Sequence, residues 1–309
     1  MKKIICSILL ICGLMQQNIF GQIPTPIKGK IIRHENFSSA HVTTRNVDVW
    51  LPENYSPQRK YAVLYMQDGQ MLFDSSTTWN KQEWGVDETL SALMMENKIQ
   101  DCIVVGIWNG GTQRHVEYFP QKPFESMNVA EKESVYNAAR KGGQSVFGGQ
   151  EIKSDGYLLF LTKELKPFID RTYPTKSDRA HTYLAGSSMG ALISLYALCE
   201  YPDVFGGAAS LSTHWPGIFA LENNPVPQAF YAYLESHLPG PKDHRIYFDH
   251  GTETLDAMYP DLQLQVDSIM HKKGYNAKQW ITKTWPGQEH SERSWKSRLH
   301  VPLLFLLKQ

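Results

Sequence analysis

Short apolar runs alternate with amphipathic stretches along most of the chain. The runs often end in turn-forming residues, as the run from Tyr61 to Met66 ends before Asp68-Gly69. We expect strands over residues 46–51, 61–66, 102–108, 182–185, 207–211, 245–249 and 279–284. Apolar spacings of three and four residues predict helices over 86–99, 157–169, 191–200, 262–272 and 292–307. This alternation predicts one doubly wound α/β domain with a mostly parallel sheet flanked by helices.

Residues 121–156 interrupt this alternation. The stretch is polar, contains two glycine pairs, and lies between an expected strand and an expected helix. Long insertions in compact domains often serve as lids or binding loops. We therefore expect either a loop insertion that acts as a lid over the functional site or a solvated excursion without a role.

The first 21 residues have the layout of a secretory signal peptide. Lys2 and Lys3 precede a mostly apolar run from Ile4 to Met15, and residues 16–21 are polar or small. The run is too short to span a bilayer, and no later stretch reaches about 18 uninterrupted apolar residues. We expect a signal peptide over 1–21, one exported domain over 22–309, no transmembrane segment, and a periplasmic or extracellular location.

Composition and short motifs exclude several classes of function. The chain has 31 Lys and Arg and 31 Asp and Glu, so it lacks the basic excess that nucleic-acid binding requires. It has no GxGxxG or GxxxxGK loop, which argues against nucleotide cofactors. HExxH and CxxC are absent, and no third ligand accompanies His244 and His250. We therefore expect no metal, no organic cofactor and no nucleic-acid partner.

Residues 186–190, Gly-Ser-Ser-Met-Gly, match the pattern GxSxG. In this turn a strand passes sharply into a helix and presents a serine hydroxyl above the sheet. The residues before the motif favour a strand and those after it a helix, which is the setting that the turn requires. Ser188 is therefore the candidate nucleophile of an acyl-transfer reaction. A neutral serine also needs a base to accept its proton and an acid to orient that base.

The base is expected late in the chain, after Ser188. His290 lies in a loop between the last expected strand and the last expected helix. His271 and His300 fall within expected helices, where a histidine usually has a structural role. We therefore predict His290 as the base.

The acid is expected in the loop after the strand 245–249. This loop contains Glu253 and Asp256, and either carboxylate is able to orient His290. We prefer Asp256. Asp249 is a third possibility, although its place within the strand favours a structural role.

Acyl transfer also needs backbone amides that stabilise an oxyanion. We expect these from Met189, which follows the nucleophile, and from Gln70 in the loop after an early strand. His214 and Trp215 follow another strand at the same sheet edge. They are predicted to line the acyl or sugar pocket, with plain packing as the alternative for Trp215.

Taken together, the motifs resemble a known family. They are the segments 63–74 (VLYMQDGQMLFD), 84–88 (WGVDE), 117–120 (EYFP) with Arg114, and 185–190 (AGSSMG). They are similar to the esterase D and enterochelin-esterase-like branch of the α/β-hydrolases. That branch includes feruloyl and acetyl-xylan esterases of carbohydrate esterase family 1, siderophore esterases, S-formylglutathione hydrolases and mycolyltransferases. The similarity covers roughly residues 46–307 and implies an α/β-hydrolase fold.

The resemblance also implies residue roles, namely nucleophile Ser188, base His290 and oxyanion donors Met189 and Gln70. Many family members carry the acid three residues after the loop glycine, where this chain has Thr254. A shift of two residues along the chain assigns the acid role to Asp256.

The expected function is that of an exported serine esterase that removes feruloyl or acetyl esters from plant polysaccharide. A siderophore esterase of the enterochelin type is one alternative. A non-catalytic carbohydrate- or siderophore-binding protein on the same fold is another, because specificity depends on pocket shape.

Overall fold

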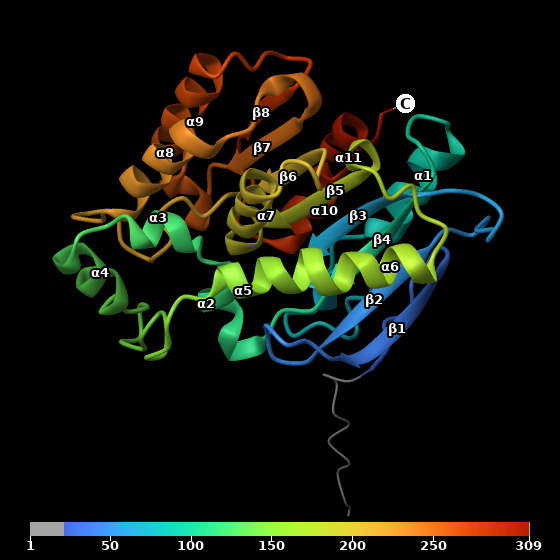
Figure 1. Cartoon of the computed structure of the whole chain (residues 1–309), viewed down its shortest axis with the longest axis horizontal. Helices are drawn as coiled ribbons and strands as arrows, with labels where there is room; N and C mark the ends of the chain where they lie inside the picture. Colours follow the sequence, from blue (N-terminus) through green and yellow to red (C-terminus); the bar gives the residue numbers. More distant parts are fainter. Residues whose placement is uncertain (1–21, 309) are drawn as a thin grey trace, which may run out of the picture.

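A computed structural model describes residues 22–308, and its sheet runs through the middle of the molecule (Figure 1). Within these residues the sheet has eight strands in the order β1-β2-β4-β3-β5-β6-β7-β8. The strands are Lys30–Phe37 (β1), Arg45–Leu51 (β2), Ala62–Gln67 (β3), Cys102–Ile107 (β4), Thr182–Ser187 (β5), Gly207–Leu211 (β6), Arg245–Gly251 (β7) and Trp280–Trp285 (β8). β2 pairs antiparallel with β1 and β4, and the other neighbours pair parallel. The mostly parallel α/β architecture predicted from the sequence is confirmed.

Helices cover both faces of this sheet (Figure 1). The α-helices are Val86–Met95 (α1), Arg114–Tyr118 (α2), Gln121–Glu125 (α3), Val129–Tyr136 (α4), Ser154–Leu159 (α5), Lys166–Thr172 (α6), Met189–Glu200 (α7), Val226–His237 (α8), Pro260–Lys272 (α9), Glu292–Arg298 (α10) and His300–Leu307 (α11). A π-helical segment, Phe160–Leu165, joins α5 to α6. None of the helices in the described part of the chain combines the length and the apolar character needed to cross a bilayer.

Side chains that alternate along the strands form two hydrophobic cores. On one face, α1, α10 and α11 pack against residues such as Leu64 and Val104. On the other face, a larger core joins α2 and α5 to α9 with residues such as Val63 and Val105. Burying both faces in this way explains why the central strands read as continuous apolar runs.

The structure differs from the predicted elements at a few places. The edge strand β1 and the helices α2, α3, α4 and α8 were not predicted, and the single helix expected over residues 292–307 is divided at Leu299 into α10 and α11. Pro302 lies in the first turn of α11 and has no amide hydrogen to donate, so an unbroken helix would lose a bond there. The signal peptide predicted over 1–21 lies outside the described residues.

Residues 121–156 are not the solvated loop that their polarity suggested. They contain α3 and α4, and α3 packs against α8. Phe124, Val135 and Phe147 are buried in the larger core, because a few apolar residues dispersed among polar ones suffice to anchor the segment. None of the residues 121–156 lines the cavity at Ser188, so the structure shows no lid there.

Candidate active site

The carboxyl ends of the parallel strands meet at one edge of the sheet, and the predicted site residues gather there. Ser188 follows β5, Asp256 lies in the helical turn Thr254–Met258 after β7, and His290 follows β8. A cavity of about 270 Å³ opens at this edge. Its walls are formed by Asp68, Gln70, Met71, Trp79, Trp84, Asn109, Arg114, Ser187, Ser188, His290, Glu292 and Trp295. This is the usual location of a ligand site in an open α/β sheet.

The turn at Ser188 is strained in the way that the GxSxG motif predicts. Ser188 has φ 56° and ψ −122°, a conformation that residues with a side chain rarely adopt. Its amide donates to the carbonyl of Leu211 at 3.0 Å, and its own carbonyl accepts from the amide of Ala191 at 3.1 Å. A Cβ atom at position 186 would lie 2.5 Å from the carbonyl oxygen of Gly190, so the turn requires glycine there. The backbone thus holds the Ser188 side chain at the cavity wall.

A hydrogen bond joins His290 to Asp256. Nδ1 of His290 lies 2.5 Å from Oδ1 of Asp256, and Oδ2 accepts from the Ser212 hydroxyl and the Gly251 amide, each at 2.6 Å. Burial acts to raise the pKa of Asp256, but these hydrogen bonds and the charge of His290 hold it below its ordinary value. Asp256 is therefore ionised at neutral pH. Because a carboxylate only accepts hydrogen bonds, Nδ1 of His290 carries the proton. Nε2 is therefore unprotonated and accepts hydrogen bonds on the side of the cavity.

The structure separates the three carboxylates that the sequence left open. Glu253 is exposed, and it makes no contact with His290. Asp249 is fully buried and accepts a hydrogen bond from the Arg298 guanidinium at 3.1 Å, so this carboxylate has a structural role. Of the three, Asp256 is the one that reaches the imidazole.

The buried guanidinium of Arg298 supports this arrangement from below. It lies 3.1 Å from Asp249 and 3.8 Å from Asp256, and all three side chains are almost fully buried. The Ser212 hydroxyl accepts from Arg298 and from the Trp295 indole, each at 2.9 Å, while it donates to Asp256. One cation thus lies within 4 Å of two buried carboxylates and offsets part of the cost of burying their charge.

Sequence reasoning missed Ser212, Trp295 and Arg298 because no motif marks them. They come from two elements, the loop after β6 and helix α10, that lie more than 80 residues apart and meet only through the sheet order. The sequence signal that existed was weak: Trp295 and Arg298 are three residues apart, on the side of α10 that faces the core.

The predicted oxyanion donors lie in the first turns of two helical segments. Met189 begins α7, and Gln70 lies in the 3₁₀ turn Gly69–Met71 at the cavity wall. Amides in the first turn of a helix have no intrahelical partner. Both N–H groups are therefore suited to bind a developing negative charge near Ser188.

A second ion pair holds the turn that carries Gln70. The carboxylate of Asp68 accepts from Nε and Nη2 of Arg114, each at 2.7 Å, and from the side-chain amide of Asn109 at 2.7 Å. Such a bidentate pair fixes position as well as charge. Asp68 itself has φ 55°, so these contacts hold it in an unfavourable conformation. Sequence analysis assigned no role to Arg114 or Asn109, although both lie shortly after the end of β4.

His214 and Trp215 do not line this cavity, contrary to the predicted placement. Both are 1% exposed, because the chain after β6 turns inward and packs them under α9. Nδ1 of His214 lies 2.9 Å from the Tyr259 hydroxyl, and the indole of Trp215 donates to Gln263 at 2.9 Å. Burial holds the pKa of His214 well below its ordinary value, so this imidazole is neutral. These contacts fit the packing alternative.

Metal-binding side chains do not converge in the structure. Across residues 22–308, no group of three or more His, Cys, Asp or Glu side chains is placed to hold a metal ion. The ring nitrogens of His244 contact the carbonyl oxygens of Gly240 and Pro202.

Comparison with known proteins gives the same class of fold and a family. Residues 38–306 match the family Esterase, described as "Putative esterase". The chain is 26% identical over 181 residues to "Uncharacterized protein YjcH" of Bacillus subtilis, which is 59% of this chain and 60% of that protein. It is 27% identical over 179 residues to the endo-1,4-beta-xylanase/feruloyl esterase of Xylanibacter ruminicola, which is 56% of this chain and 20% of that protein.

The fold is also that of a solved esterase structure. Enterochelin esterase from Shigella flexneri superposes with a TM-score of 0.63 at 17% identity, over 92% of this chain and 59% of that one. At this identity the likeness shows a shared fold. The chain spans 60% or less of each of these three proteins.

Proposed function

The chain belongs to the esterase family, and from that premise we propose that it is a serine carboxylic-ester hydrolase. Ser188 Oγ attacks the ester carbonyl carbon while His290 Nε2 accepts its proton, and Asp256 holds the imidazole in the required tautomer. The amides of Met189 and Gln70 bind the oxyanion. The tetrahedral intermediate then breaks the bond to the alcohol, which takes the proton from Nε2. Water attacks the acyl-enzyme by the same steps and releases the acid.

The short contact between His290 and Asp256 is the observation that carries this proposal. The acid is buried and ionised, and it contacts a histidine that faces the same cavity as the serine of the strained turn. Packing alone does not require this combination. Backbone strain of this kind costs on the order of 1–3 kcal/mol and persists where the surroundings enforce it. The arrangement fits catalysis better than a purely binding role.

Charge in the cavity favours a neutral ester as the substrate. Among the described residues that line it, Arg114 is neutralised by Asp68, and Glu292 adds a negative charge. A ferric siderophore carries negative charge on its chelating oxygens, so this lining disfavours it, whereas a feruloyl or acetyl ester is uncharged. Trp79, 74% exposed at the cavity, offers an aromatic face to a sugar or aryl group. We therefore place ester-decorated polysaccharide ahead of siderophores.

Export is part of the proposal and is supported by the pattern of residues 1–21 alone. Sequencing the amino terminus of the protein recovered from the exported fraction tests it. A chain that still begins at Met1 would contradict cleavage, whereas one that begins near residue 22 supports it.

Esterase activity is tested with p-nitrophenyl acetate on the wild type, Ser188→Ala and the matched control Ser187→Ala. We expect Ser188→Ala to lower kcat by at least about 10⁴-fold, because the nucleophile and its base act as a unit. The neighbouring Ser187→Ala loses the same hydroxyl group one residue earlier and should change kcat by only a few-fold. Equal background rates in the wild type and Ser188→Ala would refute the enzyme and favour the binding protein.

Substrate class is tested by comparing kcat/KM for methyl ferulate, acetylated xylan and a ferric tris-catecholate lactone. We expect the neutral esters to be hydrolysed faster than the anionic chelate. The reverse order would overturn the assignment to polysaccharide esters and favour the siderophore esterase. In that case Glu292→Gln should raise the rate on the chelate further, since it removes a negative charge from the cavity wall.

A further inference from the structure

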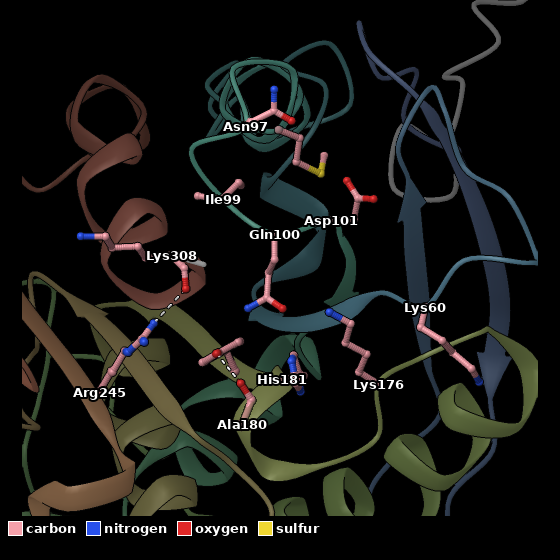
Figure 2. A pocket seen from close by; sticks show the side chains of 12 residues that line it. Lys60, Asn97, Ile99, Gln100, Asp101, Lys176, Ala180, His181, Arg245 and Lys308 are labelled. Atoms are coloured by element: carbon pink, nitrogen blue, oxygen red, sulfur yellow. Dashed lines mark hydrogen bonds between the residues drawn. The ribbon is translucent and has the colours of Figure 1, made fainter.

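A second cavity lies at the opposite edge of the sheet, where the parallel strands begin. It has a volume of about 540 Å³, larger than the cavity at Ser188. Figure 2 shows the side chains that line it. Lys60 and Asp101 contribute to it from just before β3 and β4, and Arg245 from the first residue of β7. Lys176 and Lys308 complete its charged lining. This cavity plays no part in the chemistry proposed above.

An adjoining cavity of about 370 Å³ extends the first along the same edge. The two share Ala180, Tyr183 and Arg245 in their walls. The adjoining cavity adds Arg179, Lys242, Lys278 and Asp243. We call the two cavities together the basic groove. Seven Lys or Arg and two Asp line it, so it carries an excess of positive charge in a chain whose formal net charge is zero.

Within residues 22–308, most cations of the basic groove form no ion pair. Its lysines are Lys60, Lys176, Lys242, Lys278 and Lys308. In the part of the chain that the structure describes, none of these five side chains forms an ion pair or a side-chain hydrogen bond. The two acids of the groove are already engaged, Asp101 with Arg59 at 3.5 Å and Asp243 with Arg179 at 3.4 Å. These five lysines are therefore free to bind an external anion.

The groove is long as well as basic. Its residues precede the strands from β4, through β3, β5 and β7, to β8. Five strand spacings of about 4.8 Å give it a length of about 24 Å. Figure 2 shows Gln100 between Arg245 and Lys176, so an uncharged amide lies between cations at the wall of the cavity. An extended ligand that presents both carboxylates and hydroxyl groups matches this sequence of partners.

Two other polyanions fit less well. Single-stranded nucleic acids bind proteins through exposed aromatic side chains on which bases stack. The aromatic residue in the walls of the groove, Tyr183, is 4% exposed and offers no such face. A membrane surface is flat, whereas these lysines line two hollows.

We propose that the basic groove binds a polysaccharide chain that carries uronic-acid carboxylates. The lysine ammonium groups would bind the carboxylates, and Gln100 and Asn97 the hydroxyl groups, at an accessory site on the sheet edge opposite Ser188. This inference goes beyond the proposed function, because binding of the polymer requires no turnover. Its effect on an esterase is to hold the enzyme on its substrate polymer.

The test measures binding of polygalacturonate to the Ser188→Ala protein by titration calorimetry at 50 mM and 500 mM NaCl. The matched ligand is the same polymer with its carboxyl groups reduced to alcohols. We expect binding to the acidic polymer, loss of it in 500 mM NaCl, and at least tenfold weaker binding of the reduced polymer. No binding at 50 mM NaCl, or equal affinity for the reduced polymer, would overturn the proposal.

Variants locate the site. Lys60→Gln/Lys176→Gln removes two unpaired cations of the basic groove, and Lys141→Gln/Lys163→Gln removes two exposed lysines outside it. The first pair should weaken binding by at least tenfold and the second by less than twofold. Equal losses would show nonspecific attraction and refute the site. Tighter binding of single-stranded DNA or anionic phospholipid vesicles than of polygalacturonate would refute the ligand class.

Activity separates this inference from the proposed function. In the Ser188-containing enzyme, the groove variant should retain its kcat on p-nitrophenyl acetate, because the groove and Ser188 lie at opposite ends of the strands. Its KM on an acidic, esterified polysaccharide should rise. An inactive wild-type enzyme would refute the esterase and leave the binding result standing, whereas an active enzyme without polymer binding would refute only the groove.

Discussion

Replacing Asp256 by Asn removes one charge from the buried network without changing its shape. The Gly251 amide, 2.6 Å from Oδ2, only donates, so an Asn side chain must keep its oxygen on that side. Its NH₂ group then faces Nδ1 of His290, which has to accept a hydrogen bond. The imidazole proton moves to Nε2, and Nε2 no longer accepts the proton of Ser188.

The expected loss follows from this change of tautomer. In a serine–histidine–aspartate arrangement the substitution lowers kcat by about 10⁴-fold. That factor corresponds to about 5.5 kcal/mol of transition-state stabilisation. The fold should persist, because Asn has the same size as Asp and Arg298 keeps Asp249 as its partner at 3.1 Å. A circular dichroism spectrum equal to that of the wild type confirms that the loss is kinetic.

Initial rates with p-nitrophenyl acetate at pH 7.5 measure the effect, and Glu253→Gln is the matched control. The control makes the same chemical change three residues away, on an exposed side chain of the same loop. We expect it to keep kcat within about twofold, since an exposed charge at this distance is screened. More than a tenth of the wild-type kcat in Asp256→Asn, or a comparable loss in Glu253→Gln, would refute the reasoning.

Three further predictions concern the surroundings of the site. Arg298→Met should lower the free energy of unfolding by about 3–5 kcal/mol, because it leaves two buried carboxylates without a cation; unchanged urea denaturation would contradict this. Burial lowers the pKa of His115 to about 3, against about 6.5 in the unfolded chain. The contribution of neutral His115 to the free energy of unfolding is therefore fully present above pH 6.5 and is lost as the pH falls towards 3. In denaturation at pH 7 and 4.5, the wild type should lose about 2–3 kcal/mol more than His115→Phe, and parallel losses would refute the assignment. Arg114→Lys should lower kcat by about 10- to 100-fold, because one ammonium cannot hold both oxygens of Asp68 and the turn with Gln70 shifts; an unchanged kcat would count against that role.

Local hydrophobic patterns were sufficient to predict most strands of the sheet. A parallel strand covered by helices on both faces needs apolar side chains on both sides, so runs such as that from Cys102 to Ile107 mark their own position. β1 has no such run, because an edge strand is half exposed and carries polar residues such as Lys30 and Glu35. Helix α8 does carry a helical signal, because Val226, Phe230 and Leu234 are spaced four residues apart and lie on one face of the helix.

The same distinction applies to the candidate site. Ser188 was recognisable in the sequence because a strand, a strained turn and a helix are consecutive in the chain. The choice between Glu253 and Asp256 was not, since both follow β7 in one loop and only the folded turn Thr254–Met258 exposes one and buries the other. The orientation of that turn depends on the Gly251 amide and on Ser212 from the loop after β6.

The sequence by itself determined the strands from β2 to β8, the fold class, and the serine at the sharp turn, because each depends on residues that are neighbours in the chain. Tertiary structure alone decided which carboxylate meets His290, that Arg298 lies beneath it, and that lysines from the segments before β3, β5, β7 and β8 form one groove. These features join segments tens to hundreds of residues apart. The order in which the strands pair brings them together, and hydrophobic periodicity carries no information about that order.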